Sequence, residues 1–420
     1  GTMGKTYWPG NPQAGGLAGG AAYQRLMTGG TGATVSLPQT EHFQADAVTT
    51  ISAGHAVHDT YTAFLPPLLP VFIEKMALTR AEAGLLTVFN QGPSLLQPFI
   101  GHLADRIGLR YLVILAPGIS ATAMSLLGIA PSYAVLALLL LAAGFSSAGL
   151  HSVAPVMAGR LSGHYLGRGM GFWMVGGELG RTLGPLIIVS AVEILGLEGT
   201  PWLMVGGWLA SFLLYLKLKG APDRPPTAAH NLSWQHALRT LRPLLVPLTG
   251  FVVARSFMVA ALTIYLPVFL TEEGAALWLA GASLSVLEVA GVVGALLGGS
   301  LSDRFGRRRV LLISMSCTPL LMLVFLTVDD WLHFPLLLAL GLIGLSVTPV
   351  IMALVQESYP DNRALANGLY MALGFAVRSG IIVLVGIMGD LWGMRTAFLS
   401  CALLTLLGVP FIRLLPARKR

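Results

Sequence analysis

The stretch Gly101-His-Leu-Ala-Asp-Arg-Ile-Gly-Leu-Arg110 lies between two long apolar runs. It returns as Gly299-Ser-Leu-Ser-Asp-Arg-Phe-Gly-Arg-Arg308, with six of ten positions identical. An acidic residue, a following Arg, a Gly that allows a tight turn and a trailing basic residue suit a short cytoplasmic link between two membrane-spanning helices. The two acidic positions, Asp105 and Asp303, lie 198 residues apart in a chain of 420. This spacing is close to half the chain and predicts two homologous halves.

The composition describes a chain whose solvent is mostly lipid. Hydrophobic residues make up 55% and charged residues 11%, and the mean hydropathy is +0.74. These values exclude a soluble core. Cys317 and Cys401 both lie inside apolar runs and form neither a disulfide framework nor a metal-thiolate motif. The net charge of +7 is expected from basic cytoplasmic loops, so nucleic-acid binding is not predicted.

Twelve apolar runs have about the length of 20 residues that a helix needs to cross a bilayer. They predict an all-α membrane protein of two six-helix halves. The predicted spans are 49–74, 81–104, 111–131, 133–158, 169–195, 200–219, 243–271, 277–301, 308–328, 331–357, 364–389 and 394–415.

The spans divide the chain into five segments. A flexible cytoplasmic tail and a Pro-containing cytoplasmic linker are expected outside the two bundles, and an even number of spans places both termini on one side. The expected segments are the tail 1–46, the first bundle 47–219, the linker 220–242, the second bundle 243–416 and the tail 417–420.

Basic residues predict the orientation. Eighteen Lys and Arg residues fall on the side of the two Asp-Arg loops, whereas the opposite side has only Lys75, Arg80 and Arg395. This asymmetry predicts that the loops and both termini are cytoplasmic. Four Trp residues fall where spans meet the other face, as in an aromatic belt. They are Trp202, Trp278, Trp331 and Trp392.

The two halves align at an offset of about 197 residues. Polar groups therefore recur at equivalent depths, as expected for a central cavity on a pseudo-two-fold axis. The aligned pairs are His58 with Arg255, Gln91 with Glu288, His151 with Thr348, Trp173 with Tyr370, and Arg181 with Arg378.

Ionisable residues at membrane depth are the strongest functional candidates. Each costs roughly 2.5–3.5 kcal/mol at a helix centre on the insertion scale, and such residues usually serve function. The inventory is His55, His58, Asp59, His151, Glu178, Arg181, Arg255, Glu288 and Arg378.

The first span carries three of them on one face, because His55, His58 and Asp59 are spaced by three and four residues. A carboxylate beside imidazoles inside the membrane predicts a proton-binding site. A helix-packing hydrogen-bond network without titration is one alternative. A transition-metal site is another, provided that His151 faces the first span.

Glu178 and Arg181 are three residues apart and are expected to form an intrahelical pair. Arg255 and Arg378 have no acidic residue at helical spacing, so each needs a carboxylate elsewhere or an anionic substrate. Glu288 is the expected internal partner of Arg255. This set of charges favours an anionic or zwitterionic cargo whose binding competes with protonation.

The Asp-Arg loops resemble the motif G-x-L-x-D-R-x-G-R-[KR] of the major facilitator superfamily, with Leu109 in place of a basic residue. Gly180-x-x-x-Gly184-Pro185 resembles the antiporter signature of exporters in this family and also permits close packing and a kink.

Within the superfamily the chain is most similar to the fosmidomycin resistance protein group. The resemblance covers most of the chain, and its motifs lie in five stretches. They are Gly54-His55-x-x-His58-Asp59, Ser94-Leu-Leu-Gln-Pro98, Gly144 to His151, Val175 to Pro185, and Gln356-Glu357 through Asn367-Gly368.

The chain departs from that group at four positions. His58 replaces the usual Asn, and Ser152-Val153 replaces the Pro-Glu that follows the fourth-span His. Glu178 stands where the group has a neutral Asn. These departures argue against carrying over fosmidomycin itself as the cargo.

The resemblance implies a proton-coupled secondary transporter of the bacterial cytoplasmic membrane, an antiporter that exports a small anionic or zwitterionic drug or metabolite by rocker-switch alternating access. Its partners are then a small-molecule substrate, the proton and the lipid bilayer, and it works as a monomer. Neither enzymatic activity nor a cofactor is expected, because no nucleophile-base arrangement or phosphate loop is present.

The expected roles fall into three groups. Proton coupling is assigned to Asp59, His55, His58, Glu178 and Glu288. Substrate binding is assigned to Arg181, Arg255, Arg378, His151, Gln91, Trp173 and Tyr370. Conformational gating is assigned to Gly101, Asp105, Arg106, Gly108, Asp303, Arg304, Gly306, Gly180, Gly184 and Pro185.

Two other functions compete with this one. A divalent-metal exporter would use His55, His58, Asp59 and His151 as ligands. A non-transporting membrane receptor on the same fold is a different class, and such sensors often add a soluble output domain. The longest segments outside the predicted spans are too short and too polar for one.

Overall fold

The computed structural model describes residues 43–97, 99–100, 103, 109–162, 165–220, 234–328, 330–358 and 363–415. All regular elements in these ranges are helices. Thr40–Arg420 form one compact unit. Most of the predicted N-terminal tail, the centre of the linker and residues 416–420 lie outside the described residues.

The first half contains six helical rods, some of them built from two consecutive elements. In chain order the elements are α2 (Ala45–Thr62), α3 (Leu65–Met76), α4 (Arg80–Gln91), η1 (Gly92–Leu96), α6 (Arg110–Ser125), η2 (Leu126–Ile129), α7 (Tyr133–Leu161), α8 (Leu166–Leu195), η3 (Leu197–Leu203) and α9 (Met204–Leu218).

The second half repeats this arrangement. Its elements are α10 (Trp234–Ala260), η4 (Ala261–Tyr265), α11 (Leu266–Glu272), α12 (Leu277–Phe305), α13 (Arg307–Phe325), η5 (Asp330–Leu332), α14 (His333–Gly344), α15 (Val347–Ser358), α16 (Arg363–Trp392), α17 (Met394–Leu406) and α18 (Val409–Leu414).

Local sequence signals fix several helix ends. Thr79 and Glu82 form a capping box that starts α4, so two backbone N–H groups are satisfied at its first turn. Gly306 ends α12 with φ of 90°, a left-handed conformation that favours glycine. The second Asp-Arg loop is therefore a one-residue break between α12 and α13.

Nine helices in the described residues are long and apolar enough to cross a membrane. The remaining three predicted spans match α2 with α3, α4 with η1, and α8. The first two are interrupted rods, and α8 carries the charged Glu178 and Arg181. The fold is the predicted all-α membrane fold of twelve helical rods.

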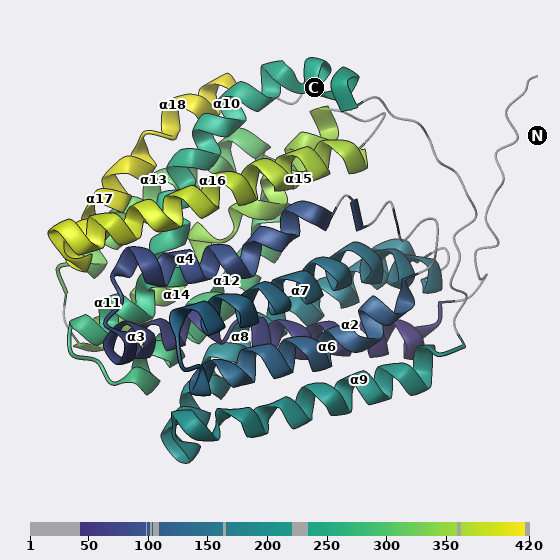
Figure 1. The fold of residues 1–420 in the computed structure, drawn as a ribbon. Coiled ribbons are helices and arrows are strands. Elements are labelled where there is room, and N and C mark those ends of the chain that lie inside the picture. Colours follow the sequence, from purple (N-terminus) through teal and green to yellow (C-terminus); the bar gives the residue numbers. More distant parts are fainter. Residues whose placement is uncertain are drawn as a thin grey trace, which may run out of the picture. The chain divides into compact units, whose positions relative to one another are not determined.

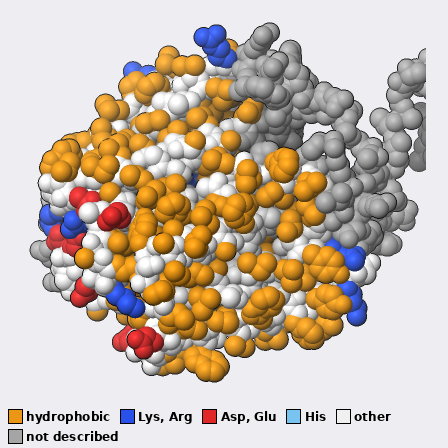
Figure 2. Space-filling view, viewed as in Figure 1, with side chains coloured by type: hydrophobic (Ala, Val, Ile, Leu, Met, Phe, Trp, Pro, Cys, Tyr) orange, Lys and Arg blue, Asp and Glu red, His pale blue; other side chains and the backbone are white. Residues whose placement is uncertain are grey.

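The surface agrees with a lipid environment. Figure 2 shows a face covered by hydrophobic side chains, with charged side chains gathered at its margins. Trp202, Trp331 and Trp392 are 76%, 75% and 58% exposed, and Trp278 is 42% exposed. Their exposure suits the aromatic belt that the sequence predicts.

Equivalent helices pack together in the two halves. In the first half α2 packs along α8, and in the second half α10 packs along α16 (Figure 1). The two halves meet where α4 packs against α16 and α8 packs against α12. This is the layout expected from the offset of 197 residues.

The hydrogen bonds and ion pairs that join described residues of the two halves lie at one end, which the basic loops predict to be extracytoplasmic. The Arg80 guanidinium lies 2.8 Å from Glu272 and 3.4 Å from Asp390. The Trp278 indole N–H donates to the Ser190 hydroxyl at 3.0 Å. The halves are therefore held together at this end.

Candidate functional site

Glycines of α8 allow the functional face of α2 to come close. A Cβ at Gly176 would lie 2.3 Å from the Ser52 carbonyl oxygen, and one at Gly180 would lie 2.3 Å from the Ala56 carbonyl oxygen. A Cβ at Gly177 would lie 2.5 Å from the His55 ring. Glycine is thus required at this crossing, which agrees with the predicted close packing of the α8 glycines.

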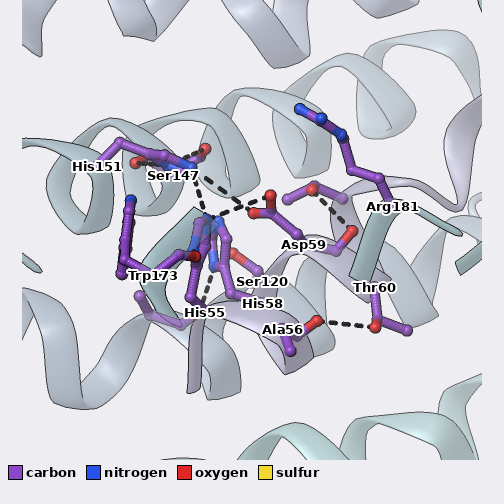
Figure 3. A network of polar contacts seen from close by, with 12 residues as sticks. His55, Ala56, His58, Asp59, Thr60, Ser120, Ser147, His151, Trp173 and Arg181 are labelled. Carbon is purple, nitrogen blue, oxygen red and sulfur yellow. Dashed lines mark hydrogen bonds and ion pairs between the residues drawn. The ribbon is translucent and has the colours of Figure 1, made fainter. Parts of the chain in front are cut away.

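Three side chains meet beside this crossing (Figure 3). The Nε2 atom of His55 lies 3.3 Å from the Asp59 carboxylate and 3.2 Å from Nε2 of His151. The same atom of His151 lies 3.7 Å from the other Asp59 carboxylate oxygen. His151 therefore faces the first span, which satisfies the condition set for a metal site.

Backbone carbonyls hold the two imidazoles in place. His55 donates from Nδ1 to the Trp173 carbonyl oxygen at 2.9 Å, and His151 donates from Nδ1 to the Ser147 carbonyl oxygen at 2.9 Å. The Trp173 indole stacks on the His55 ring, with 3.6 Å between ring centroids. Trp173, predicted to bind substrate, is buried against His55.

His58 lies beside this trio but outside it. Its Nδ1 donates to the Ala116 carbonyl oxygen at 3.4 Å, and its ring centroid lies 5.8 Å from that of His151. Its Nε2 is buried and has no hydrogen-bond partner among the described residues. The four-residue metal set expected from sequence is therefore reduced to His55, Asp59 and His151.

A second charged group centres on Arg181. Glu178 and Arg181 form the predicted ion pair within α8. Glu288 of α12 interacts electrostatically with both of them, so the group spans the two halves. The prediction that Glu288 pairs with Arg255 is wrong, because α12 faces α8 and brings Glu288 to Arg181 instead.

A third group lies in the second half. Arg255 donates from Nη2 to the Thr348 hydroxyl at 3.3 Å, while its Nε is buried without a partner among the described residues. The Arg378 guanidinium lies 5.2 Å from the centre of the Phe375 ring. Tyr370 interacts electrostatically with both arginines. Across the described part of the chain, no carboxylate forms an ion pair with either guanidinium.

The second half thus mirrors the first in position but not in chemistry. The contact of Arg255 with Thr348 stands where the ring of His58 approaches the ring of His151. A small cavity lined by Arg255, Ser314 and Thr318 lies at this position. Imidazoles and a carboxylate in one half are replaced by guanidinium and hydroxyl groups in the other.

Two further predicted residues, Gln91 and Asp303, lie near helix ends. Gln91 ends α4, and its side-chain oxygen is buried without a partner in the described structure. Arg307, which follows Gly306, pairs with Asp303 at 2.6 Å and with Glu357 at 2.8 Å.

The predicted gating residues divide between described and undescribed parts of the chain. Gly184 packs against the Thr60 carbonyl oxygen, inside the first half. Pro185, which follows it, lies within the unbroken helix α8. Arg304 is exposed near the end of α12. Four further predicted gating residues lie outside the described residues: Gly101, Asp105, Arg106 and Gly108.

Sequence reasoning missed the polar group that joins the halves. Asp390 accepts hydrogen bonds from the backbone N–H groups of Arg80 and Ala81, at 2.7 and 3.0 Å. The Tyr265 hydroxyl donates to the carbonyl oxygens of Arg80 and Ile382. Arg80 was visible in the sequence as one of three basic residues on its side, but only contacts from distant helices identify its partners.

The sequence pattern of the Major Facilitator Superfamily matches residues 51–302 and 280–420. The chain belongs to the major facilitator superfamily. Members of this superfamily are membrane transporters, so the chain is a multi-pass membrane transporter.

Two curated relatives in this superfamily match most of the chain. The transporter YfnC of Bacillus subtilis (strain 168) is 26% identical over 372 residues, covering 86% of this chain and 90% of YfnC. The fosmidomycin resistance protein of Escherichia coli (strain K12) is 23% identical over 372 residues, with the same coverage. The resemblance to the fosmidomycin resistance group is thereby confirmed.

Solved structures of the superfamily share the fold. A bacterial homolog of the human lysosomal transporter Spinster, in an inward-facing and unoccupied conformation, has a TM-score of 0.76 and 14% identity, covering 90% of this chain and 98% of that chain. The nucleoside transporter NupG has a TM-score of 0.70 and 16% identity, covering 88% of this chain and all of NupG.

Proposed function

We propose that the protein is a proton-coupled antiporter that exports a small anionic or zwitterionic molecule across the bacterial cytoplasmic membrane. One observation carries the proposal, the uneven distribution of carboxylates. Arg181 interacts with Glu178 in its own half and with Glu288 in the other half, whereas Arg255 and Arg378 have no carboxylate partner in the described chain. A transporter with this arrangement takes a proton on one group and an anion on the other.

The proposed anion site is supported by two positively charged guanidinium groups that have no acidic partner in the described part of the chain. A guanidinium at membrane depth is costly unless it is paired, and neither Arg255 nor Arg378 has an acidic partner in the described residues. Arg255 also keeps an unpartnered N–H at a small cavity. An anionic cargo that pairs with these groups lowers this cost, which gives the binding its driving force.

The proton end is assigned to Glu288. It lies on α12, whereas its partner Arg181 lies on α8, so rocking of the halves changes the separation between these charges. A proton binds Glu288 more tightly when Arg181 is farther away. Uptake from outside in one conformation and release inside in the other follow from this difference. His55, Asp59 and His151 lie within one half, which moves as a rigid body.

The halves are joined at the end predicted to be extracytoplasmic, so we take the described conformation as inward-facing, a state that exporters and importers share. Two observations favour export. Gly180-x-x-x-Gly184-Pro185 resembles the antiporter signature of exporters. A relative is named for resistance to a drug, which supports export.

The anion end is tested by cargo binding. Purified protein is screened by thermal shift against organic anions, phosphonates and zwitterions, with fosmidomycin among the probes. We expect Arg378→Ala to weaken binding of the best probe about tenfold or more, because a charged hydrogen bond contributes about 1.5–3 kcal/mol. The matched control is Arg395→Ala, because Arg395 pairs with Glu273 at the end predicted to be extracytoplasmic, outside the proposed cargo site.

The proposed cargo site would be wrong if Arg378→Ala bound the probe as tightly as the wild-type protein. Arg378→Lys separates charge from shape. It keeps the positive charge but loses the planar fork of donors, so we expect an intermediate affinity.

A further inference from the structure

The trio His55, His151 and Asp59 has a geometry that the transport cycle described above does not use. We infer that these three side chains form a binding site for a divalent transition metal ion of the zinc class. The inference goes beyond the proposed function, because the three residues lie in one half and are neither the proposed proton carrier, Glu288, nor the proposed anion ligands, Arg255 and Arg378.

The hydrogen bonds of the two imidazoles determine which ring nitrogens are free. A backbone carbonyl oxygen only accepts, so the Nδ1 atoms facing Trp173 and Ser147 must carry hydrogen. In each neutral ring Nε2 then has a lone pair instead of a hydrogen. Imidazoles that bind metals are usually oriented in this way, with the second ring nitrogen donating to a carbonyl or carboxylate.

These lone pairs converge on one point. The two Nε2 atoms are 3.2 Å apart, and an Asp59 carboxylate oxygen lies within 3.3 Å of one and another within 3.7 Å of the other. Two lone pairs and an anion this close repel one another unless a cation lies among them. The arrangement therefore calls for a positive charge among these atoms, either a metal ion or a proton on one Nε2.

The spacing matches a tetrahedral ion. Ligands about 2.0–2.1 Å from a zinc ion lie about 3.4 Å from one another at the corners of a tetrahedron. His55 Nε2 lies 3.2 Å from His151 Nε2 and 3.3 Å from one Asp59 oxygen, both close to this edge length. One ligand atom from each of the three residues lies within 4.8 Å of the others. Three protein ligands leave one corner for water or another ligand, as in sites that exchange their fourth ligand.

An ion can reach the site from one side, and the donor atoms decide which ions it binds. The side chains of His55 and Asp59 are 5% and 9% exposed, whereas that of His151 is 30% exposed. An ion can therefore enter past His151. Two imidazole nitrogens and one carboxylate oxygen favour Zn²⁺, Co²⁺ or Ni²⁺ over the harder ions Ca²⁺ and Mg²⁺.

The surrounding charges are compatible with this ion. Arg181 also interacts with Asp59, but it is paired with Glu178 in the same helix. His58 is buried beside the trio and has its Nε2 unpartnered among the described residues. The single carboxylate of Asp59 offsets half of the charge of a divalent ion.

The test is isothermal titration calorimetry of the full chain with ZnCl₂, on protein purified without a polyhistidine tag. We expect one saturable site per chain. His151→Gln and Asp59→Asn each keep the side-chain volume but remove a ligand, and each should weaken the affinity at least about tenfold. His333→Gln, which lies against Phe325 away from the trio, should bind zinc as the wild type does.

The inference is overturned if wild-type protein shows no saturable zinc binding, the result expected if a shared proton instead fills the space between the imidazoles. It is also overturned if both ligand variants bind zinc with unchanged affinity. Folding of each variant is checked by its thermal unfolding midpoint. Glu288→Gln, which removes the proposed proton group, should leave zinc affinity unchanged, so the two proposals fail separately.

Discussion

At the scale of single residues, the site depends as much on absent side chains as on present ones. Gly177 leaves room for the contact between His55 and Asp59, and its symmetry mate at the offset of 197 is Gly374. A Cβ at Gly374 would meet nothing within 4 Å. The two glycines occupy equivalent sequence positions, but only Gly177 has neighbours that leave no room for a side chain.

This difference gives a matched pair of substitutions. Gly177→Ala forces the His55 ring away, and such overpacking costs typically about 1–3 kcal/mol. We expect a lower thermal unfolding midpoint and weaker zinc binding. Gly374→Ala should leave the midpoint unchanged or raise it, because Ala favours a helix over Gly. Equal midpoints for the two variants would contradict the crowding at Gly177.

At the scale of helices, the junction of α4 with α16 holds the closed end. The Asp390 carboxylate accepts hydrogen bonds from the first backbone N–H groups of α4 and pairs with the Arg80 guanidinium. The same guanidinium also pairs with the Glu272 carboxylate. A carboxylate at a helix N-terminus is stabilised by the unpaired N–H groups there. A residue of one half thus caps a helix of the other.

Removing this cap should open the outer end. We expect Asp390→Asn to raise the population in which the two halves are separated there. It is measured by the distance between spin labels at Glu74→Cys and Ala276→Cys, two exposed positions on α3 and beside α12. The control is Glu273→Gln, because Glu273 pairs with Arg395 inside the second half. Unchanged distances in Asp390→Asn would show that the contact does not hold the halves together.

At the scale of the whole molecule, periodic and repeated features could be predicted from sequence, whereas contacts between distant helices could not. The span lengths and the 198-residue repeat of the Asp-Arg loops follow from local composition. The pair of Glu178 with Arg181 follows from helical spacing. Glu288 was assigned to Arg255, because nothing in one sequence indicates which helix of the other half α12 faces.

The trio was predicted only in part for the same reason. His55 and Asp59 share a helix face and were placed together from their spacing of four residues. The contact with His151, 96 residues away, depends on how α7 packs against α2. The sequence predicts His151 as a substrate-binding residue or, in the alternative, as a metal ligand, and the structure places its ring beside Asp59.

The proton-coupling proposal is tested most directly by the pH dependence of conformation in the absence of cargo. With the same pair of spin labels, wild-type protein should shift towards separated outer ends as the pH falls, because protonated Glu288 no longer attracts Arg181 across the halves. In Glu288→Gln we expect this shift to be absent and the separated population to be raised at every pH. A Glu288→Gln protein that kept the full pH-dependent shift would contradict the proposal.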